Sequence, residues 1–110
     1  MPRAKNRVSR QIFNEVFKKT RPFSISGLKL RFYPNKITQV AFVVSKNVAK
    51  KATDRNLWKR RGLAVFRKIK NNTKSGTYLF FVQPDIGKQS FKSIEEKILL
   101  LLKKSRLIHE

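Results

Sequence analysis

The sequence contains no cysteine, one histidine and no long apolar run. The absence of cysteine excludes a disulfide framework and a thiolate metal site. The histidine, His109, stands near the C-terminal end, where we expect the chain to fray. The longest apolar run, residues 98–102, is far shorter than a membrane span, and no N-terminal apolar stretch resembles a signal peptide. We therefore expect a cytoplasmic protein that does not associate with a membrane.

Acidic residues are scarce, whereas basic residues are abundant. Six Asp and Glu stand against 27 Lys and Arg in 110 residues, which gives a formal net charge of +21. A small domain with this charge repels itself unless a polyanion lies against it. Hydrophobic residues make up 40% of the chain, so the composition is that of a folded domain rather than a disordered basic tail. We interpret residues 1–110 as a single nucleic-acid-binding domain, in preference to a merely solvated basic surface or a protein of anionic membrane surfaces.

The few carboxylates also limit the chemistry that the protein can perform. A protein nuclease that uses two metal ions needs several carboxylates converging on one site. Here the pattern places one acidic residue at a helix cap and two in the first turn of another helix. If phosphodiester chemistry takes place near this protein, we expect another molecule to perform it. The acidic residues are Glu15, Asp54, Asp85, Glu95, Glu96 and Glu110.

The apolar pattern predicts helices packed on a small sheet, an α/β sandwich. Residues 1–7 are basic without apolar periodicity, and we expect them to form a flexible arm. The strands at 28–33 and 38–44 flank a turn signal and are predicted to pair as an antiparallel hairpin. The expected elements are, in order, a helix over 9–19, strands over 28–33 and 38–44, a helix from Thr53 or Asp54 to about Lys70, a strand over 78–82 that is covered on both faces, and a helix from Ser90 or Ser93 with Ile94, Ile98, Leu101 and Leu102 toward the core.

Two rings of the first helix and one face of the first strand form a candidate binding surface. Phe13 and Phe17 form a ridge beside the apolar positions 8, 12 and 16. Lys29, Arg31 and Tyr33 point away from the apolar side of their strand. Aromatic rings mixed with cations are typical of surfaces that stack bases and follow phosphates. Core packing of the two rings and a solvated outer strand face remain the alternatives.

The predicted helix over 54–70 combines a buried stripe with a basic outer surface. Gly62 lies within the stripe, although glycine is about 1 kcal/mol less favourable than alanine inside a helix. We expect it to leave room for the indole of Trp58. The stripe consists of Trp58, Gly62, Val65, Phe66 and Ile69, and the cations mostly outside it are Arg55, Lys59, Arg60 and Arg67.

The order of these motifs resembles the protein subunit of bacterial ribonuclease P. The signature of that family is Arg-Asn-Arg followed by an apolar residue and Lys-Arg, and residues 55–61 read RNLWKRR. Residues 43–46 (VVSK) resemble the strand end that precedes the signature, and residues 13–17 (FNEVF) match the Phe-x-x-Val-Phe of the family's first helix. Residues 78–84 and the closing amphipathic helix also fit. Three departures stand out: Leu57 and Leu63 occupy positions where the family has Arg, and the connection from Ser45 to Arg55 is slightly longer than usual.

The resemblance implies a fold and a function. The implied fold is α+β, a two-layer sandwich of order αβββαβα like the second domain of ribosomal protein S5, with a left-handed βαβ crossover. The implied role is to bind precursor tRNA and the ribonuclease P RNA, which cleaves off the 5′ leader with Mg²⁺ held mainly by RNA and substrate. No catalytic residue, protein metal site or obligate protein partner is implied. The residues expected at the leader are Phe13, Phe17, Lys29, Arg31 and Tyr33, and those expected at the catalytic RNA are Lys46, Lys50, Lys51, Arg55, Asn56, Lys59, Arg60 and Arg67.

Other functions fit the charge and the aromatic residues as well. The main alternative is a ribosomal-type RNA-binding protein or RNA chaperone with no role in cleavage. A protein-only nuclease conflicts with the scarcity of carboxylates. DNA recognition by the helix over 55–70 would need a partner helix in a helix-turn-helix arrangement, and the strand content argues against it.

Overall fold

The computed structural model describes residues 8–87 and 93–109, so the expected arm at residues 1–7 and the candidate cap Ser90 lie outside the described residues. The element order αβββαβα is the one that the resemblance implied. The elements are α1 (Arg10–Lys19), β1 (Phe23–Ile25), β2 (Leu28–Pro34), β3 (Gln39–Val44), α2 (Ala52–Ile69), β4 (Gly76–Val82) and α3 (Ile94–Lys104), with short 3₁₀ turns η2 (Lys70–Asn72) and η3 (Pro84–Ile86).

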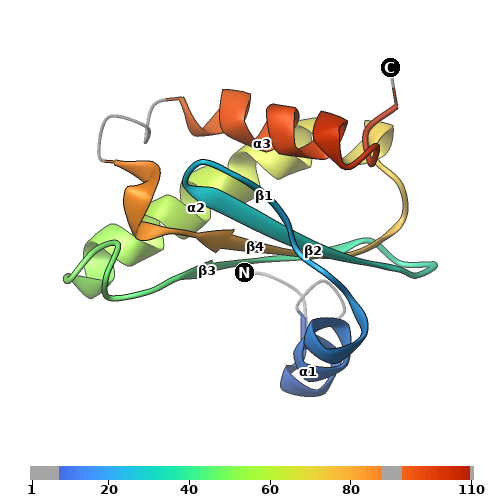
Figure 1. The fold of residues 1–110 in the computed structure, drawn as a ribbon, viewed down its shortest axis with the longest axis horizontal. Coiled ribbons are helices and arrows are strands. Elements are labelled where there is room, and N and C mark those ends of the chain that lie inside the picture. Colours follow the sequence, from blue (N-terminus) through green and yellow to red (C-terminus); the bar gives the residue numbers. More distant parts are fainter. Residues whose placement is uncertain (1–7, 88–92, 110) are drawn as a thin grey trace.

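A four-stranded mixed sheet of order β1-β2-β4-β3 forms the centre of the molecule. Figure 1 shows this sheet nearly edge-on, with α2 and α3 on one side and α1 on the other. The predicted α/β sandwich is thus confirmed. Strand β4 lies between β2 and β3, and six of its seven residues are buried. Its uninterrupted apolar run correctly predicted a strand covered on both faces.

The predicted hairpin of residues 28–33 with 38–44 is wrong. Strand β2 pairs antiparallel with β4, whereas β3 pairs parallel with β4 on the opposite edge. The short connection after β2 passes the end of β4 and leads to the opposite edge of the sheet. Strand β4, between its two neighbours, is more completely buried than the edge strand β3. The crossover from β3 through α2 to β4 then places the helix over the sheet, as a parallel connection requires.

The resemblance implied a third strand before α2, but the residue pattern did not locate it, and this strand is β1. It is three residues long, and its residues Phe23–Ile25 pair with Leu28–Leu30 across a two-residue turn at Ser26 and Gly27. Gly27 has φ +85°, and a Cβ there would lie 2.6 Å from the Cα of Ile86. The Ser-Gly dipeptide between two apolar segments was the available signal for a tight hairpin.

The main core lies between the sheet and the pair α2 and α3. The rings of Phe42 and Phe80 stack with centroids 4.7 Å apart, and those of Phe66 and Tyr78 are 4.9 Å apart. All four predicted core positions of α3 are buried. Burial raises the pKa of the Tyr78 hydroxyl, an effect that a hydrogen bond with Thr73 partly offsets. The hydroxyl donates to the carbonyl of Lys74 at 2.6 Å.

Helix α2 begins earlier than predicted. Its N-cap is Lys51, without a side-chain cap, and Thr53 and Asp54 lie inside the first turn. The N–H groups of Asp54 and Arg55 both donate to the carbonyl of Lys51 at 3.1 Å, so the backbone turn starts the helix without a side-chain acceptor. The buried stripe was predicted correctly, since Trp58, Gly62, Val65 and Phe66 are buried and Ile69 is half-buried.

Gly62 makes room for a different ring from the one expected. A Cβ at this position would lie 2.4 Å from the ring of Phe42 on β3. The glycine therefore allows α2 to approach the sheet closely, rather than accommodating Trp58.

The described C-terminal residues do not fray, contrary to the prediction. The backbone N–H of Lys74 donates to Leu107, and that of His109 donates to Asn72, at 2.9 and 2.6 Å. Thr73 and Ile108 form an antiparallel bridge, and Leu107 is buried. Among the described helices, none is long and apolar enough to cross a membrane.

Candidate nucleic-acid interface

Helix α1 packs against the sheet face that α2 and α3 leave uncovered. Ser9 caps its N-terminus by accepting from the N–H of Ile12 at 3.2 Å. Val16 is fully buried, whereas Ile12 and Val8 are only half-buried. The apolar positions 8, 12 and 16 beside the Phe13–Phe17 ridge thus comprise one well-buried side chain and two partly exposed ones.

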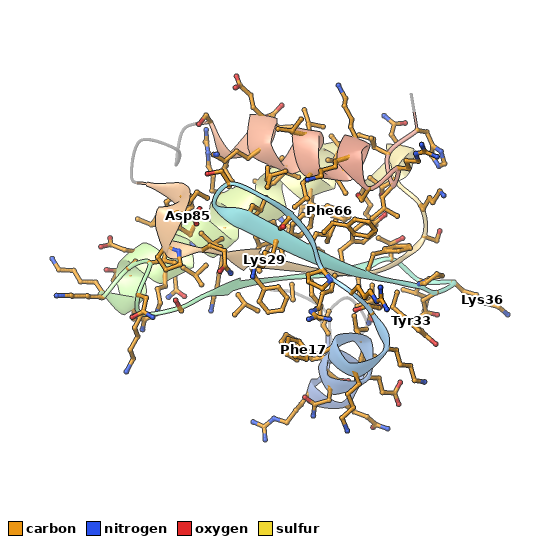
Figure 2. The ribbon with its side chains drawn as sticks, in the orientation of Figure 1. Phe17, Lys29, Tyr33, Lys36, Phe66 and Asp85 are labelled. Carbon is orange, nitrogen blue, oxygen red and sulfur yellow. The ribbon has the colours of Figure 1, made fainter. Side chains whose placement is uncertain are left out.

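The two rings of α1 lie beside the sheet but outside the main core. The rings of Phe13 and Phe17 are 6.2 Å apart, and both contact Phe81 of β4 edge-on at 6.0 and 6.2 Å. Phe17 is 48% exposed, whereas Phe66 in the main core is 1% exposed. Figure 2 shows Phe17 and Phe66 on opposite sides of the sheet. Simple core packing therefore does not describe Phe17.

Arg31 connects β2 to the end of α1. Its guanidinium lies 4.1 Å from the ring centroid of Phe17 and donates to the carbonyl of Phe17 at 3.1 Å. The same group donates to the carbonyl of Thr20. These are carbonyls that the helix itself leaves without partners. Arg31 thus fixes the helix against the strand and keeps a cation above an exposed ring.

The other two predicted leader residues lie on the same face of β2. Lys29 is exposed and pairs across the sheet with Phe81, so it lies next to the aromatic group of α1. Tyr33 is half-buried, with the Nζ of Lys19 5.8 Å from its ring centroid. The structure thus brings all five predicted leader residues to one side of the sheet.

Two members of this surface, Phe81 and Lys19, were not predicted from the sequence. Phe81 was assigned to a strand buried on both faces, although its position in the alternation of β4 places it opposite Lys29. Lys19 was treated only as the end of the first helix. Phe81 is recognised only from the pairing of β2 with β4, and the sequence pattern predicted a different pairing.

The residues predicted to face the catalytic RNA divide into a loop and a helix face. Lys46, Lys50 and Lys51 are exposed in the connection between β3 and α2. Arg55 is half-buried, and its guanidinium donates to the carbonyls of Ala49 and Lys50 at 2.9 and 2.8 Å. The guanidinium therefore shapes the loop.

The helix part of this set lies along α2. Asn56, Arg60 and Arg67 are exposed, and their spacing places them on the face opposite the buried stripe. Lys59 is half-buried beside them, nearer the sheet. Because α1 lies on the other side of the sheet, the two predicted RNA-binding surfaces are separated by the sheet (Figure 1).

The described residues do not contain a site for a catalytic metal. Within residues 8–87 and 93–109, no three His, Asp or Glu side chains are close enough together to hold a metal ion. Glu95 and Glu96 lie in the first turn of α3 as predicted, and the carboxylate of Glu95 pairs with the Nζ of Lys68 at 3.1 Å.

Comparisons with known proteins identify the family and a shared fold. The family model described as Ribonuclease P matches residues 1–106. A ribonuclease P protein component from a Nitratiruptor species is 30% identical over 92 residues, covering 84% of each chain. One from a Pseudanabaena species is 29% identical over 85 residues, covering 76% of this chain and 73% of its own.

Solved structures of the same kind of protein share the fold. The Staphylococcus aureus RNase P protein superposes with a TM-score of 0.85 at 18% identity, covering 94% of this chain and 98% of its own. The RNase P protein from Thermotoga maritima gives 0.76 at 25% identity, covering 86% and 92%. With a family match over nearly its whole length, the chain belongs to the ribonuclease P protein family.

Proposed function

We propose that the protein binds the 5′ leader of precursor tRNA on the surface formed by α1 and β2, and the catalytic RNA on α2 and the loop before it. The RNA subunit then cleaves off the leader, with Mg²⁺ held mainly by the RNA and the substrate. The observation that carries this proposal is the half-exposed ring of Phe17, with the Arg31 guanidinium 4.1 Å from its centroid, in a chain of this family.

The chemistry of the α1 surface suits a single strand. Exposed aromatic rings stack on bases of any sequence, with a typical gain of 1–3 kcal/mol per base, while neighbouring cations follow the phosphates. Phe13 and Phe17 supply the rings, and Lys29 supplies a cation beside them. Because a leader is single-stranded, its bases are available for such stacking.

The assignment of cleavage to RNA is supported by the composition of the chain. The chain has only six Asp and Glu, and two-metal hydrolysis by a protein would require several of them in one site. The five within the described residues are spread over α1, α2, η3 and α3. Purified protein with precursor tRNA and Mg²⁺ should therefore give no specific product. Addition of a bacterial ribonuclease P RNA at low Mg²⁺ should give the mature 5′ end. An RNA chaperone without a role in cleavage would leave the RNA's activity unchanged.

Leader recognition is tested by truncating Phe17 and Tyr33. Each change to Ala should weaken binding of leader-bearing precursor tRNA by roughly five- to a hundredfold, since one stacked base is lost, and leave binding of mature tRNA nearly unchanged. Thermal unfolding is measured in parallel. Phe66→Ala is the matched control, because this ring is buried and its loss should cost about 3–5 kcal/mol of stability. A loss of stability with intact leader discrimination would contradict the proposal.

A further inference from the structure

A hollow of about 860 Å³ lies where the loop after β3 leads into α2. Its lining comes from residues 46–51 of the loop and from Asp54, Leu57 and Trp58 of the first helical turns. This volume is within the usual range of small-ligand pockets, roughly 300–1,000 Å³. The loop and the start of α2 lie at the left of Figure 1, at the end of β3.

The shape of the hollow is fixed by hydrogen bonds within the loop. The N–H groups of Val48 and Ala49 donate to the carbonyl of Ser45 at 3.0 and 3.3 Å. The guanidinium of Arg55 donates to the carbonyls of Ala49 and Lys50 from the helix side. A loop held at both ends in this way is preorganised, so a ligand does not need to order it on binding.

The lining combines an apolar wall with cations. Val48, Leu57 and Trp58 supply apolar surface, and Leu57 is 46% exposed although it directly precedes the buried Trp58. Lys46, Lys50 and Lys51 stand around this wall, with Asp54 as the one carboxylate among the lining residues. A ligand with a flat apolar part and flanking negative charges is complementary to this arrangement, and a nucleotide within an RNA strand has both features.

We propose that this hollow binds one unstacked nucleotide of RNA, with its base against Leu57 and the accessible edge of Trp58 and its flanking phosphates at the three lysines. This inference rests on the proposed function in taking RNA as the partner. It adds that the surface near α2 recognises an unpaired base, and not phosphates alone. Arg55 acts as a positioning residue, because it holds the loop that carries the lysines.

The test uses Trp58, which is the only tryptophan of the chain and lines the hollow. The full-length protein is titrated with a four-nucleotide adenosine RNA and with an abasic oligomer of the same length and charge. Tryptophan emission reports binding in the hollow rather than at α1. The base-bearing oligomer should quench it and bind on the order of tenfold more tightly than the abasic one.

Two variants assign the effect to the apolar wall. Leu57→Ala should remove most of the difference between the two oligomers, whereas Leu100→Ala, at a 57% exposed position of α3, should leave it intact. Leu57→Arg adds a cation in place of the wall. The proposal expects it to lose discrimination, whereas a surface that binds only phosphates would gain affinity for both oligomers.

Several outcomes would overturn the proposal. Equal quenching by both oligomers would mean that the lysines bind phosphates without reading a base. Quenching by an acidic peptide, with no response to either oligomer, would assign the hollow to a protein ligand. If wild-type protein stimulates cleavage by ribonuclease P RNA but its emission does not distinguish the oligomers, the nucleotide site fails while the proposed function stands. If it does not stimulate cleavage, the proposed function fails.

Discussion

The hydroxyl of Tyr78 lies in the main core, and its ionisation makes the stability of the protein sensitive to alkaline pH. Burial raises the pKa of this hydroxyl above 10.0 in the folded protein, whereas the unfolded chain has the ordinary value. The folded state therefore keeps the proton at a pH where the unfolded state loses it. The contribution to stability is complete below pH 10 and decreases as the pH rises from there through the folded-state pKa.

Replacement of Tyr78 by Phe isolates this effect. At pH 7 the variant should be less stable by about 1 kcal/mol, since the hydrogen bond to the carbonyl of Lys74 is lost. Above pH 10 the difference in stability should shrink. Ionisation of Tyr78 in the unfolded chain then favours unfolding of the wild type, and the Phe variant has no such group. Chemical denaturation across this range measures it, and deprotonation of the many lysines affects both proteins alike. A constant difference would contradict the predicted titration.

Gly62 permits a close approach of α2 to the sheet, and its replacement tests that contact. An exposed glycine in a helix gains about 1 kcal/mol when changed to alanine. At Gly62 the new Cβ would lie 2.4 Å from the Phe42 ring, so the ring or the helix must shift. We expect Gly62→Ala to destabilise the protein by about 1–3 kcal/mol, as overpacking does. Ala64→Gly, at an exposed position of the same helix, measures the difference in helix propensity between alanine and glycine alone. If Gly62→Ala stabilises the protein, the Phe42 ring moves aside at little cost.

Arg31 connects β2 to α1, and we expect this contact to stabilise the helix in its position on the sheet. The helix has ten residues, which is too short for independent stability in water. Arg31→Ala removes the hydrogen bonds to the carbonyls of Phe17 and Thr20 and the contact with the Phe17 ring. Hydrogen exchange of the α1 amides should then accelerate by roughly ten- to thirtyfold, equivalent to about 1.4–2 kcal/mol, while the amides of β4 stay protected. Lys29→Ala, at an exposed position on the same strand face, should change the exchange of neither the α1 nor the β4 amides. Equal α1 exchange in the wild type, Arg31→Ala and Lys29→Ala would show that α1 is held by its apolar contacts alone.

The sequence predicted the helices better than the pairing of the strands. Periodicity identifies the buried face of a helix directly, and the stripes of α2 and α3 were recognised at nearly every position. Strand pairing depends on which strand can be buried on both sides, a property of the whole sheet. Proximity in sequence favoured a hairpin of β2 with β3, whereas β4 lies between these two strands in the observed order. The apolar runs of β3 and β4 are alike, so the sequence pattern does not indicate which of them lies at the centre.

The residues of the candidate site could be predicted from the sequence, but the partners that their side chains bind could not. The alternation of β2 correctly placed Lys29, Arg31 and Tyr33 on one face. It could not indicate that Arg31 donates to carbonyls of α1, or that Arg55 donates to the loop before α2. A pattern gives the side to which a cation points, whereas the partner depends on tertiary contacts between segments.

The charge of the whole molecule has opposite effects on stability and on binding. With 27 basic and six acidic residues, the cations outnumber the carboxylates by 21. Their mutual repulsion opposes folding in the absence of RNA, and salt screens it over a Debye length of about 10 Å at 0.1 M. The free energy of unfolding of the isolated protein should therefore increase as NaCl is raised from 20 to about 300 mM. A decrease would mean that attractive ion pairs, such as Lys68 with Glu95, outweigh the repulsion.

Binding to the catalytic RNA should instead weaken steeply with salt, because each neutralised phosphate releases counterions. Every such contact contributes about −0.7 to −0.9 to the slope of log K against log salt. Lys59→Ala and Arg60→Ala on α2 should each weaken binding and flatten that slope by roughly one. Lys103→Ala is the matched control, since this lysine is exposed near the end of α3. An equal change in slope for all three variants would mean that the RNA responds to net charge alone, whereas an unchanged slope for Lys59→Ala and Arg60→Ala would remove the α2 face from the interface.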